Sequence, residues 1–268
     1  MSRASAFLLS GLLLLVGASA KAAEPFNWNG PYVGLNAGYY WVHQDWFDVD
    51  SWFNGQTITT RPDGGAVGGT VGYNYVLNGL LLGLEADLDW LSVTAQNRVN
   101  NLTYRVGTTS TSTSTSTSTD FYGNTTTTTT TSTTSNPPAT TSVKLKSDWP
   151  WAGSLRARAG VPFDRGLVYL TAGVALAEWT DKWTDTSACP TGWTCSYSKS
   201  GVTPGGLFGG GVEYALTDHL LVGTSINWVE YQTRTSPALY YYSQAIPYRY
   251  KMPADSFYLR LSVNYKLW

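Results

Sequence analysis

The charged residues of this sequence alternate with apolar ones, a spacing that could build a buried network of ion pairs. Glu85, Asp87 and Asp89 occupy every second position in the segment LLLGLEADLDWLS. Successive side chains of a β-strand point to opposite faces, so the three carboxylates would share one face. Charged residues with the equivalent phase elsewhere bring the set to four acids and four bases: Glu85, Asp87, Asp89, Arg156, Arg158, Glu213, Arg260 and Lys266.

This pattern of charges favours a barrel with a polar interior over a soluble sheet. A soluble sheet does not normally line its core with three acids, whereas a membrane-spanning barrel has a polar lumen and an apolar exterior. A buried charge without a partner is strongly unfavourable, so the acids and bases should pair. We predict a salt-bridged lumen, with a narrow ion path or gated pore through the same charges as the alternative.

Enzymatic chemistry is not expected, because the sequence has two histidines and no nucleophile placed beside either. His219 lies in a predicted turn, and His43 begins a predicted loop beside Gln44 and Asp45. Hydrolase chemistry on a barrel would require a Ser/His pair or a similar arrangement. We therefore predict no catalytic residues, no metal site and no resident cofactor.

The two cysteines lie close together in the segment CPTGWTC. Cys189 and Cys195 enclose Pro190 and Gly192, which suit a tight turn. The spacing does not match a zinc site and no histidine is near. Because an exported chain meets an oxidising compartment, we predict a disulfide between Cys189 and Cys195 at a hairpin tip.

Export is indicated by the first 22 residues, which have the features of a signal peptide. Arg3 precedes an apolar run, Ala6–Val16, that is too short to span a bilayer, and small residues follow it. Cleavage near residues 20–23 would leave residues 23–268 as a single barrel domain. The net charge of −1 gives no electrostatic case for nucleic-acid binding.

Eight segments of the remaining chain alternate with period two and are expected to be antiparallel strands. Their connections alternate between short and long, as in a transmembrane up-and-down β-barrel with short periplasmic turns and four long external loops. The expected strands are Pro31–Val42, Ala66–Val76, Leu80–Ser92, Trp149–Val161, Val168–Leu176, Phe208–Leu216, Leu220–Trp228 and Phe257–Leu267. The expected long loops are His43–Asp63, Asn97–Ser147, Asp181–Pro204 and Arg234–Pro253.

Aromatic residues gather near the ends of these segments and predict two interfacial belts. The expected outer belt contains Trp41, Trp90, Trp149, Trp151, Trp179 and Trp228, and the expected inner belt contains Tyr32, Tyr73, Tyr75, Phe163, Tyr214 and Tyr265.

Three segments, WNGPYVG (28–34), GLEADLDW (83–90) and GGGVEYALTD (209–218), resemble a known family. They are similar to the small eight-stranded outer-membrane proteins of alphaproteobacteria, porin-family relatives of the opacity-type surface proteins. The closing LSVNYKLW resembles their C-terminal assembly signal, although Trp268 is one step out of phase with Tyr265 and Leu267. A curled terminus or a β-bulge would account for that step.

The resemblance implies a protein of the Gram-negative outer membrane that stabilises the envelope and presents its loops to the environment or a host. Its expected partners are outer-membrane lipid and lipopolysaccharide, the barrel-assembly machinery, and a possible host or phage ligand, and we expect a monomer. A narrow pore is one alternative. The other is haem binding, which has been assigned to relatives and for which His43, Tyr241 and Tyr248 are candidate contacts.

Residues 98–146 contain the tracts TSTSTSTST and TTTTTTT and are expected to be a disordered external loop. Both flanking strands are needed to close one sheet, so this segment is a loop and not a linker between domains. Alternating Ser and Thr also favour extended chain, which could prolong the strands beyond the membrane.

Overall fold

The computed structural model describes residues 26–49, 55–104, 110–134, 139–185, 196–236, 239–240 and 247–268. These residues form an all-β structure whose strands are β1 (Gly30–Asp48), β2 (Thr57–Thr60), β3 (Asp63–Leu77), β4 (Leu80–Tyr104), β5 (Ser110–Thr119), β6 (Thr125–Thr134), β7 (Ala139–Phe163), β8 (Gly166–Asp185), β9 (Ser196–Ala215), β10 (Leu220–Thr235), β11 (Leu239–Tyr240), β12 (Pro247–Tyr248) and β13 (Tyr250–Lys266). Within the described part of the chain, no helix is long and apolar enough to cross a membrane.

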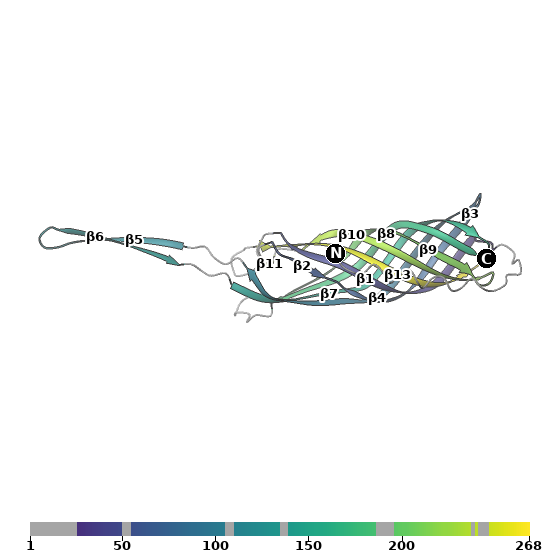
Figure 1. The fold of residues 1–268 in the computed structure, drawn as a ribbon, viewed down its shortest axis with the longest axis horizontal. Helices are drawn as coiled ribbons and strands as arrows, with labels where there is room; N and C mark the ends of the chain where they lie inside the picture. The colour runs from purple at the N-terminus through teal and green to yellow at the C-terminus, as the bar shows by residue number, and fades with distance from the viewer. Residues whose placement is uncertain are drawn as a thin grey trace, which may run out of the picture.

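Eight antiparallel strands close into a ring, which confirms the predicted barrel. The order around the ring is β1, β3, β4, β7, β8, β9, β10 and β13, and β13 pairs with β1 to complete it. The short strand β2 continues the line of β3 along β1. Figure 1 shows these strands inclined to the long axis, as barrel closure requires.

Short turns join neighbouring strands at one end of the barrel, as the sequence predicts. The first is Asn78-Gly79, and both of these residues have positive φ angles, 52° and 83°. That conformation matches the right-handed twist of a hairpin and favours Asn-Gly. The other turns are residues 164–165 and 216–219. The C-terminus lies at this same end (Figure 1).

The strands are longer than the sequence analysis expected, and much of each predicted long loop is part of the barrel. β4 and β7 have 25 residues each, whereas about 9–11 residues of a tilted strand suffice to cross a bilayer. The expected loops that begin at His43, Asn97, Asp181 and Arg234 therefore begin as strand. The barrel extends well beyond the band of apolar side chains that would contact lipid.

Two segments of the barrel differ in polarity, and we name them by residue ranges. In the membrane segment, apolar side chains point outward and polar ones inward. In the outer segment, most outward side chains are polar, and the inward ones are large aromatic or aliphatic residues together with a set of buried polar groups. The membrane segment comprises residues 31–42, 63–77, 80–91, 151–163, 166–176, 205–215, 220–228 and 257–266. The outer segment comprises residues 43–48, 57–62, 92–101, 142–150, 177–184, 196–204, 229–235 and 250–256.

A pair of β-bulges lies at the border between the two segments. The register between β4 and β7 shifts between Trp90 and Val93, and the register between β7 and β8 shifts between Asp148 and Ala152. An extra residue in one strand reverses which face the following side chains occupy. Trp149 therefore points into the barrel and is only 1% exposed, whereas Trp90 points outward and is 63% exposed.

The aromatic belts are thus smaller than predicted. Trp41, Trp90 and Trp228 lie on the outer face as expected, and so do Tyr73, Tyr75, Phe163, Tyr214 and Tyr265. Trp149, Trp179 and Tyr32 instead point into the barrel. Trp179 is an odd number of residues from the outward Leu176, so the alternation itself places it inside.

The Ser/Thr tract departs from the expected disorder, because β5 and β6 form an antiparallel ribbon within it. The two strands pair from Ser110 with Thr134 to Thr119 with Thr125. The Asp120 carboxylate caps the connecting turn by accepting hydrogen bonds from the backbone amides of Tyr122 and Asn124, at 2.9 and 2.8 Å. β-branched threonine favours extended chain, and the ladder satisfies the backbone of both strands. Figure 1 shows the ribbon projecting beyond the ends of β4 and β7.

Candidate functional site

The centre of the membrane segment is occupied by a network of buried ion pairs. Arg158 contacts Glu85 at 2.8 Å and Glu213 at 3.0 Å. Arg156 also bonds Glu85, through Nε at 2.8 Å, and contacts Asp87 at 3.0 Å. Since Glu85 and Arg156 are directly opposite each other on β4 and β7, strand pairing itself positions this part of the network.

Arg260 of β13 extends the network across the lumen. Its Nη2 lies 2.9 Å from Asp87 and 2.6 Å from Asp89. The structure thereby brings together seven of the eight charged residues singled out in the sequence, and all seven are buried. Favourable pairing of this kind compensates for the loss of water around each charge.

Lys266, the eighth residue, is apart from the network. Its Nζ donates a hydrogen bond of 2.6 Å to the backbone carbonyl of Asn27 and lies 5.2 Å from the Phe26 ring. These contacts are at the end of the barrel with the short turns. An apolar cluster closes the lumen there, made of Phe26, Trp28, Leu81, Leu167, Tyr169, Ala215 and Leu221.

Lumen tyrosines, which the sequence analysis missed, add hydrogen bonds to the charges. The Tyr32 hydroxyl donates to Glu85 at 2.5 Å and accepts from Arg158 at 2.6 Å. The Tyr40 hydroxyl donates to Asp89 at 2.7 Å, and the Tyr40 ring stacks on Tyr258 with centroids 4.3 Å apart. The inward phase of Tyr40 was visible in the sequence, since it is the residue between the outward Tyr39 and Trp41.

A second polar cluster, in the outer segment, was also missed. Asp181 contacts Arg234 at 3.1 Å, and it accepts hydrogen bonds from Ser147 at 2.6 Å and from the Gln44 amide at 3.3 Å. The Arg234 guanidinium also lies over the Trp179 ring, 4.2 Å from its centroid. These residues fall in the segments that the sequence analysis took as loops, so the alternation of inward and outward residues was not extended to them.

Burial disfavours the charged form of both members of this outer ion pair. It raises the pKa of Asp181 above its usual range, although Arg234 and the hydrogen bonds from Ser147 and Gln44 oppose the shift. It lowers the pKa of Arg234, although Asp181 opposes that shift. The pair is thus held in an apolar setting at a desolvation cost.

Two apolar clusters enclose this ion pair along the barrel axis. One contains Tyr40, Val42, Trp149, Trp179, Val229, Tyr231, Ala254 and Tyr258 among its members. The other lies further from the membrane segment and contains Trp46, Ile58, Val143, Leu145, Trp183, Tyr250 and Met252. The lumen is therefore filled by side chains from the short turns to the outer segment.

Of the remaining candidates from the sequence, His43 is the one whose side chain the structure describes. His43 is on the outer face, with its Nδ1 3.4 Å from Asp255 and its Nε2 3.7 Å from Asp45. Tyr241, Cys189 and Cys195 lie outside the described residues, and of Tyr248 only the backbone, in β12, is described. The disulfide and the haem contacts therefore stay predictions. No group of three potential metal ligands occurs among the described residues.

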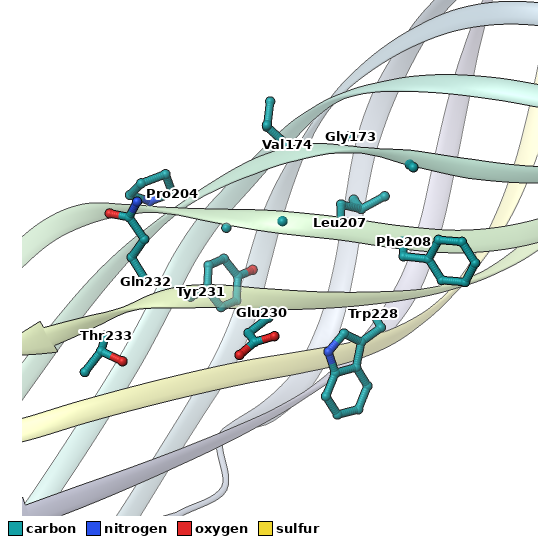
Figure 2. A pocket seen from close by; sticks show the side chains of 13 residues that line it. Gly173, Val174, Pro204, Leu207, Phe208, Trp228, Glu230, Tyr231, Gln232 and Thr233 are labelled. Atoms are coloured by element: carbon teal, nitrogen blue, oxygen red, sulfur yellow. The ribbon is translucent and has the colours of Figure 1, made fainter.

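A shallow groove of about 830 Å³ lies on the outer face where β8, β9 and β10 meet. Figure 2 shows Phe208 and Trp228 on neighbouring strands beside it. A side chain added at Gly206 would meet no atom within 4 Å, so the missing side chain leaves the groove open. Its apolar lining faces the surroundings of the barrel and not the lumen.

Trp268 is out of phase with Tyr265 and Leu267 because it follows the end of the last strand. β1 and β13 pair without a register shift, and β13 ends at Lys266. Trp268 follows the strand and is 74% exposed. The Leu267 amide still donates a hydrogen bond of 3.0 Å to the Pro31 carbonyl, so the terminus stays beside β1, and no bulge between β1 and β13 corrects its phase.

Comparison with known proteins identifies the family. The sequence profile described as "Outer membrane protein beta-barrel domain" matches residues 10–237. The chain belongs to this family. It is therefore an outer-membrane β-barrel protein of a Gram-negative bacterium.

The chain is similar to the 31 kDa outer-membrane immunogenic protein of Brucella melitensis biotype 1. The two are 28% identical over 214 residues, which cover 75% of this chain and 70% of the relative. Among solved structures, outer membrane protease OmpT from Escherichia coli is similar with a TM-score of 0.47 and 7% identity, over 92% of this chain and 100% of that one. Neisserial surface protein A gives a TM-score of 0.36 and 14% identity, over 89% and 97% of the two chains.

Proposed function

We propose that this outer-membrane barrel is a non-enzymatic surface protein that contributes to envelope integrity and displays its outer segment and ribbon outside the cell. The observation that carries the proposal is the filled lumen. Buried side chains occupy it at successive levels, from the Phe26 cluster through the ion pairs to the Trp46 cluster. Interactions with other molecules would therefore use the exterior of the barrel and not its lumen.

A sealed lumen fits the dimensions of the barrel. Eight strands enclose an interior that side chains can fill, so an open channel would require removal of the Arg156, Arg158 and Arg260 pairs. Each of these guanidinium groups has a carboxylate within 3.0 Å. The relative named an immunogenic outer-membrane protein supports exposure at the surface for this chain as well.

The proposed partners follow from this location. Outer-membrane lipid and lipopolysaccharide would surround the membrane segment, and the barrel-assembly machinery would engage the C-terminal strand β13. A host or phage ligand would meet the ribbon or the outer rim.

Planar-bilayer recording tests the sealed barrel directly. We expect the reconstituted full-length protein to show no discrete conductance steps. A double variant, Arg156→Ala/Arg158→Ala, shortens two lumen side chains and serves as the comparison. Discrete steps from the unaltered protein would contradict the proposal and support the narrow pore.

A deletion strain tests the envelope role. Cells lacking the protein should admit large antibiotics or release periplasmic enzymes more readily than the parent, and the gene supplied in trans should restore the barrier. Haemin titration of the purified protein covers the haem alternative, for which a Soret shift abolished by His43→Ala would be the supporting result.

A further inference from the structure

Four basic side chains gather on one side of the outer segment, and we call them the outer basic face: Arg98, Lys144, Lys146 and Lys182. They lie on the neighbouring strands β4, β7 and β8. Arg98 pairs directly with Lys144, and Lys146 pairs directly with Lys182. Since their neighbours Val143, Leu145 and Trp183 point inward, these four side chains point outward.

The arrangement is unfavourable for the barrel itself. Like charges directly opposite each other on neighbouring strands destabilise a sheet. Asp148 is the acid that contacts the face, through Lys146 Nζ at 2.8 Å. Among the described side chains, no carboxylate lies within ion-pair distance of Arg98, Lys144 or Lys182. Packing alone gives no reason for placing cations opposite cations here.

The opposite side of the barrel has the reverse charge. In the ring order, β13 is four strands away from β7 in either direction. On β13, Asp255 faces outward directly opposite Glu230 of β10 and His43 of β1. Asp45 lies beside the same histidine. The exposed cations Arg61, Lys199 and Lys251 lie singly elsewhere on the outer segment, whereas the outer basic face sets cations directly opposite cations.

The position of the outer basic face relative to the lipid-facing band indicates which molecules can contact it. On β4, Trp90 is the last large apolar residue that faces outward among the described side chains, and Thr94, Gln96 and Arg98 follow it along that face. On β8, Leu176 is the last, and Lys182 is three outward positions further along. Aromatic residues mark the bilayer interface. The cations therefore lie beyond it, six to eight residues further along these strands, on the side of the outer leaflet.

We propose that the outer basic face binds the phosphate groups of an outer-leaflet glycolipid. Lysine and arginine form charge-assisted hydrogen bonds to phosphate oxygens. A bound phosphate would offset the repulsion between Lys146 and Lys182. Asp148 holds Lys146 in position through their ion pair. The Thr94 hydroxyl in turn donates a hydrogen bond of 2.6 Å to the Asp148 carboxylate. This inference rests on the proposed surface role only in requiring the outer segment to be outside the cell.

The test uses full-length protein refolded into zwitterionic nanodiscs and titrated with bisphosphorylated lipid A or with its dephosphorylated form. Unaltered protein should retain the phosphorylated lipid at least tenfold more strongly. The variant Lys146→Gln/Lys182→Gln should lose that preference and bind both lipids alike. Lys251→Gln removes an exposed lysine of the outer segment on the acidic side and should leave the preference unchanged. Heat-modifiable migration verifies that each variant is folded.

A charge-reversed variant separates lipid binding from a structural effect. Lys182→Glu places a carboxylate opposite Lys146, so it should raise the urea midpoint while abolishing the preference for phosphorylated lipid. An unchanged preference in Lys182→Glu or in the double glutamine variant would overturn the proposal, as would an equal loss in Lys251→Gln. Crosslinks from Lys146 to Asp255 of a second copy, unaffected by lipid A, would overturn it in favour of self-association. None of these results depends on conductance, so failure here is distinguishable from failure of the sealed-barrel proposal.

Discussion

The membrane segment and the outer segment are built from the same strands but have opposite polarity. Along β4, Leu84 points out and Glu85 points in, whereas further along Gln96 points out and Val93 points in. Along β7, Arg156 of the membrane segment points into the lumen. In the outer segment of the same strand, Leu145 points into the lumen and Lys146 points outward. Hydrogen bonding between strands continues through both segments, so backbone pairing does not distinguish them.

What changes between the two segments is the solvent outside the barrel. Lipid selects apolar outward side chains and leaves the polar ones to pair within the lumen. Water selects polar outward side chains and leaves aromatic ones to pack within, as in a soluble sandwich. The β-bulges beside Trp90 and Trp149 lie where one pattern gives way to the other. The comparison predicts where the same kind of substitution should have unequal effects.

The largest effect is expected from removing the central cation of the membrane segment. Arg158→Met leaves Glu85 and Glu213 without their shared partner and should lower the free energy of unfolding by about 3–5 kcal/mol. Guanidinium unfolding in detergent measures it. The matched control is Lys266→Met, which removes one hydrogen bond to a carbonyl and should cost about 1 kcal/mol. Equal losses from both variants would show that the lumen ion pairs stabilise the barrel no more than a single hydrogen bond does.

A substitution on the outer face compares the two segments along one strand. Leu84→Arg places a charge in the lipid-facing band and should cost about 2–4 kcal/mol. Gln96→Arg makes the same change on the same face of β4 in the outer segment and should shift stability by less than about 0.5 kcal/mol. Unfolding midpoints in lipid vesicles report both. If Gln96→Arg proved as damaging as Leu84→Arg, the lipid boundary would lie further out than Trp90.

The ion pair of the outer segment is expected to be replaceable, because burial disfavours both of its charges. Asp181→Asn and Arg234→Met should each cost about 1–3 kcal/mol, since each leaves a buried polar group without its partner. The double variant should lose less stability than the sum of the two losses, because removing both charges together leaves neither of them buried without its partner. A double-mutant cycle by urea unfolding measures the coupling. Strict additivity would mean that the two side chains do not act as a pair.

The smallest effect is expected from the ribbon. Deleting residues 110–134 removes β5 and β6, which pair with each other and are not part of the barrel sheet. Shortening the loop almost fourfold lowers its closure cost by about 1 kcal/mol, so stability should rise by no more than about 1 kcal/mol. Heat-modifiable migration and the urea midpoint are the measurements. Failure of the deleted protein to fold would make the ribbon part of the barrel core.

Sequence alternation predicted the barrel and the lumen pairs because both depend on local spacing. Glu85 and Arg156 fall on the inward face of strands whose phase no bulge interrupts between them and the short turns. Trp149 was misplaced because the bulge beside it changes the phase, and Pro150, which marks a bulge within a strand, was not taken into account. Lys266 was grouped with the network because its side chain has the inward phase. Phase alone does not say how far along the barrel axis a residue lies.

The outer ion pair was missed for a different reason. Strand propensity alone does not separate a barrel extension from a loop, and Asp181 and Arg234 are surrounded by turn-forming and hydroxyl residues. Their partnership joins β8 and β10, which are not neighbours in the ring, so it depends on the filled interior. The tertiary arrangement of the aromatic side chains around Arg234 provides that information, and single-strand periodicity does not.

The ribbon has a further consequence that follows from its pairing. Ten residue pairs span about 33 Å at the usual rise of a strand. Because nearly every position in both strands is Ser or Thr, a slip by two residues presents the same side chains, and the register carries no unique packing. Each dipeptide added to both strands would lengthen the ribbon by about 7 Å without any change elsewhere. The length of the ribbon is thus set by a dipeptide copy number, independently of the barrel that carries it.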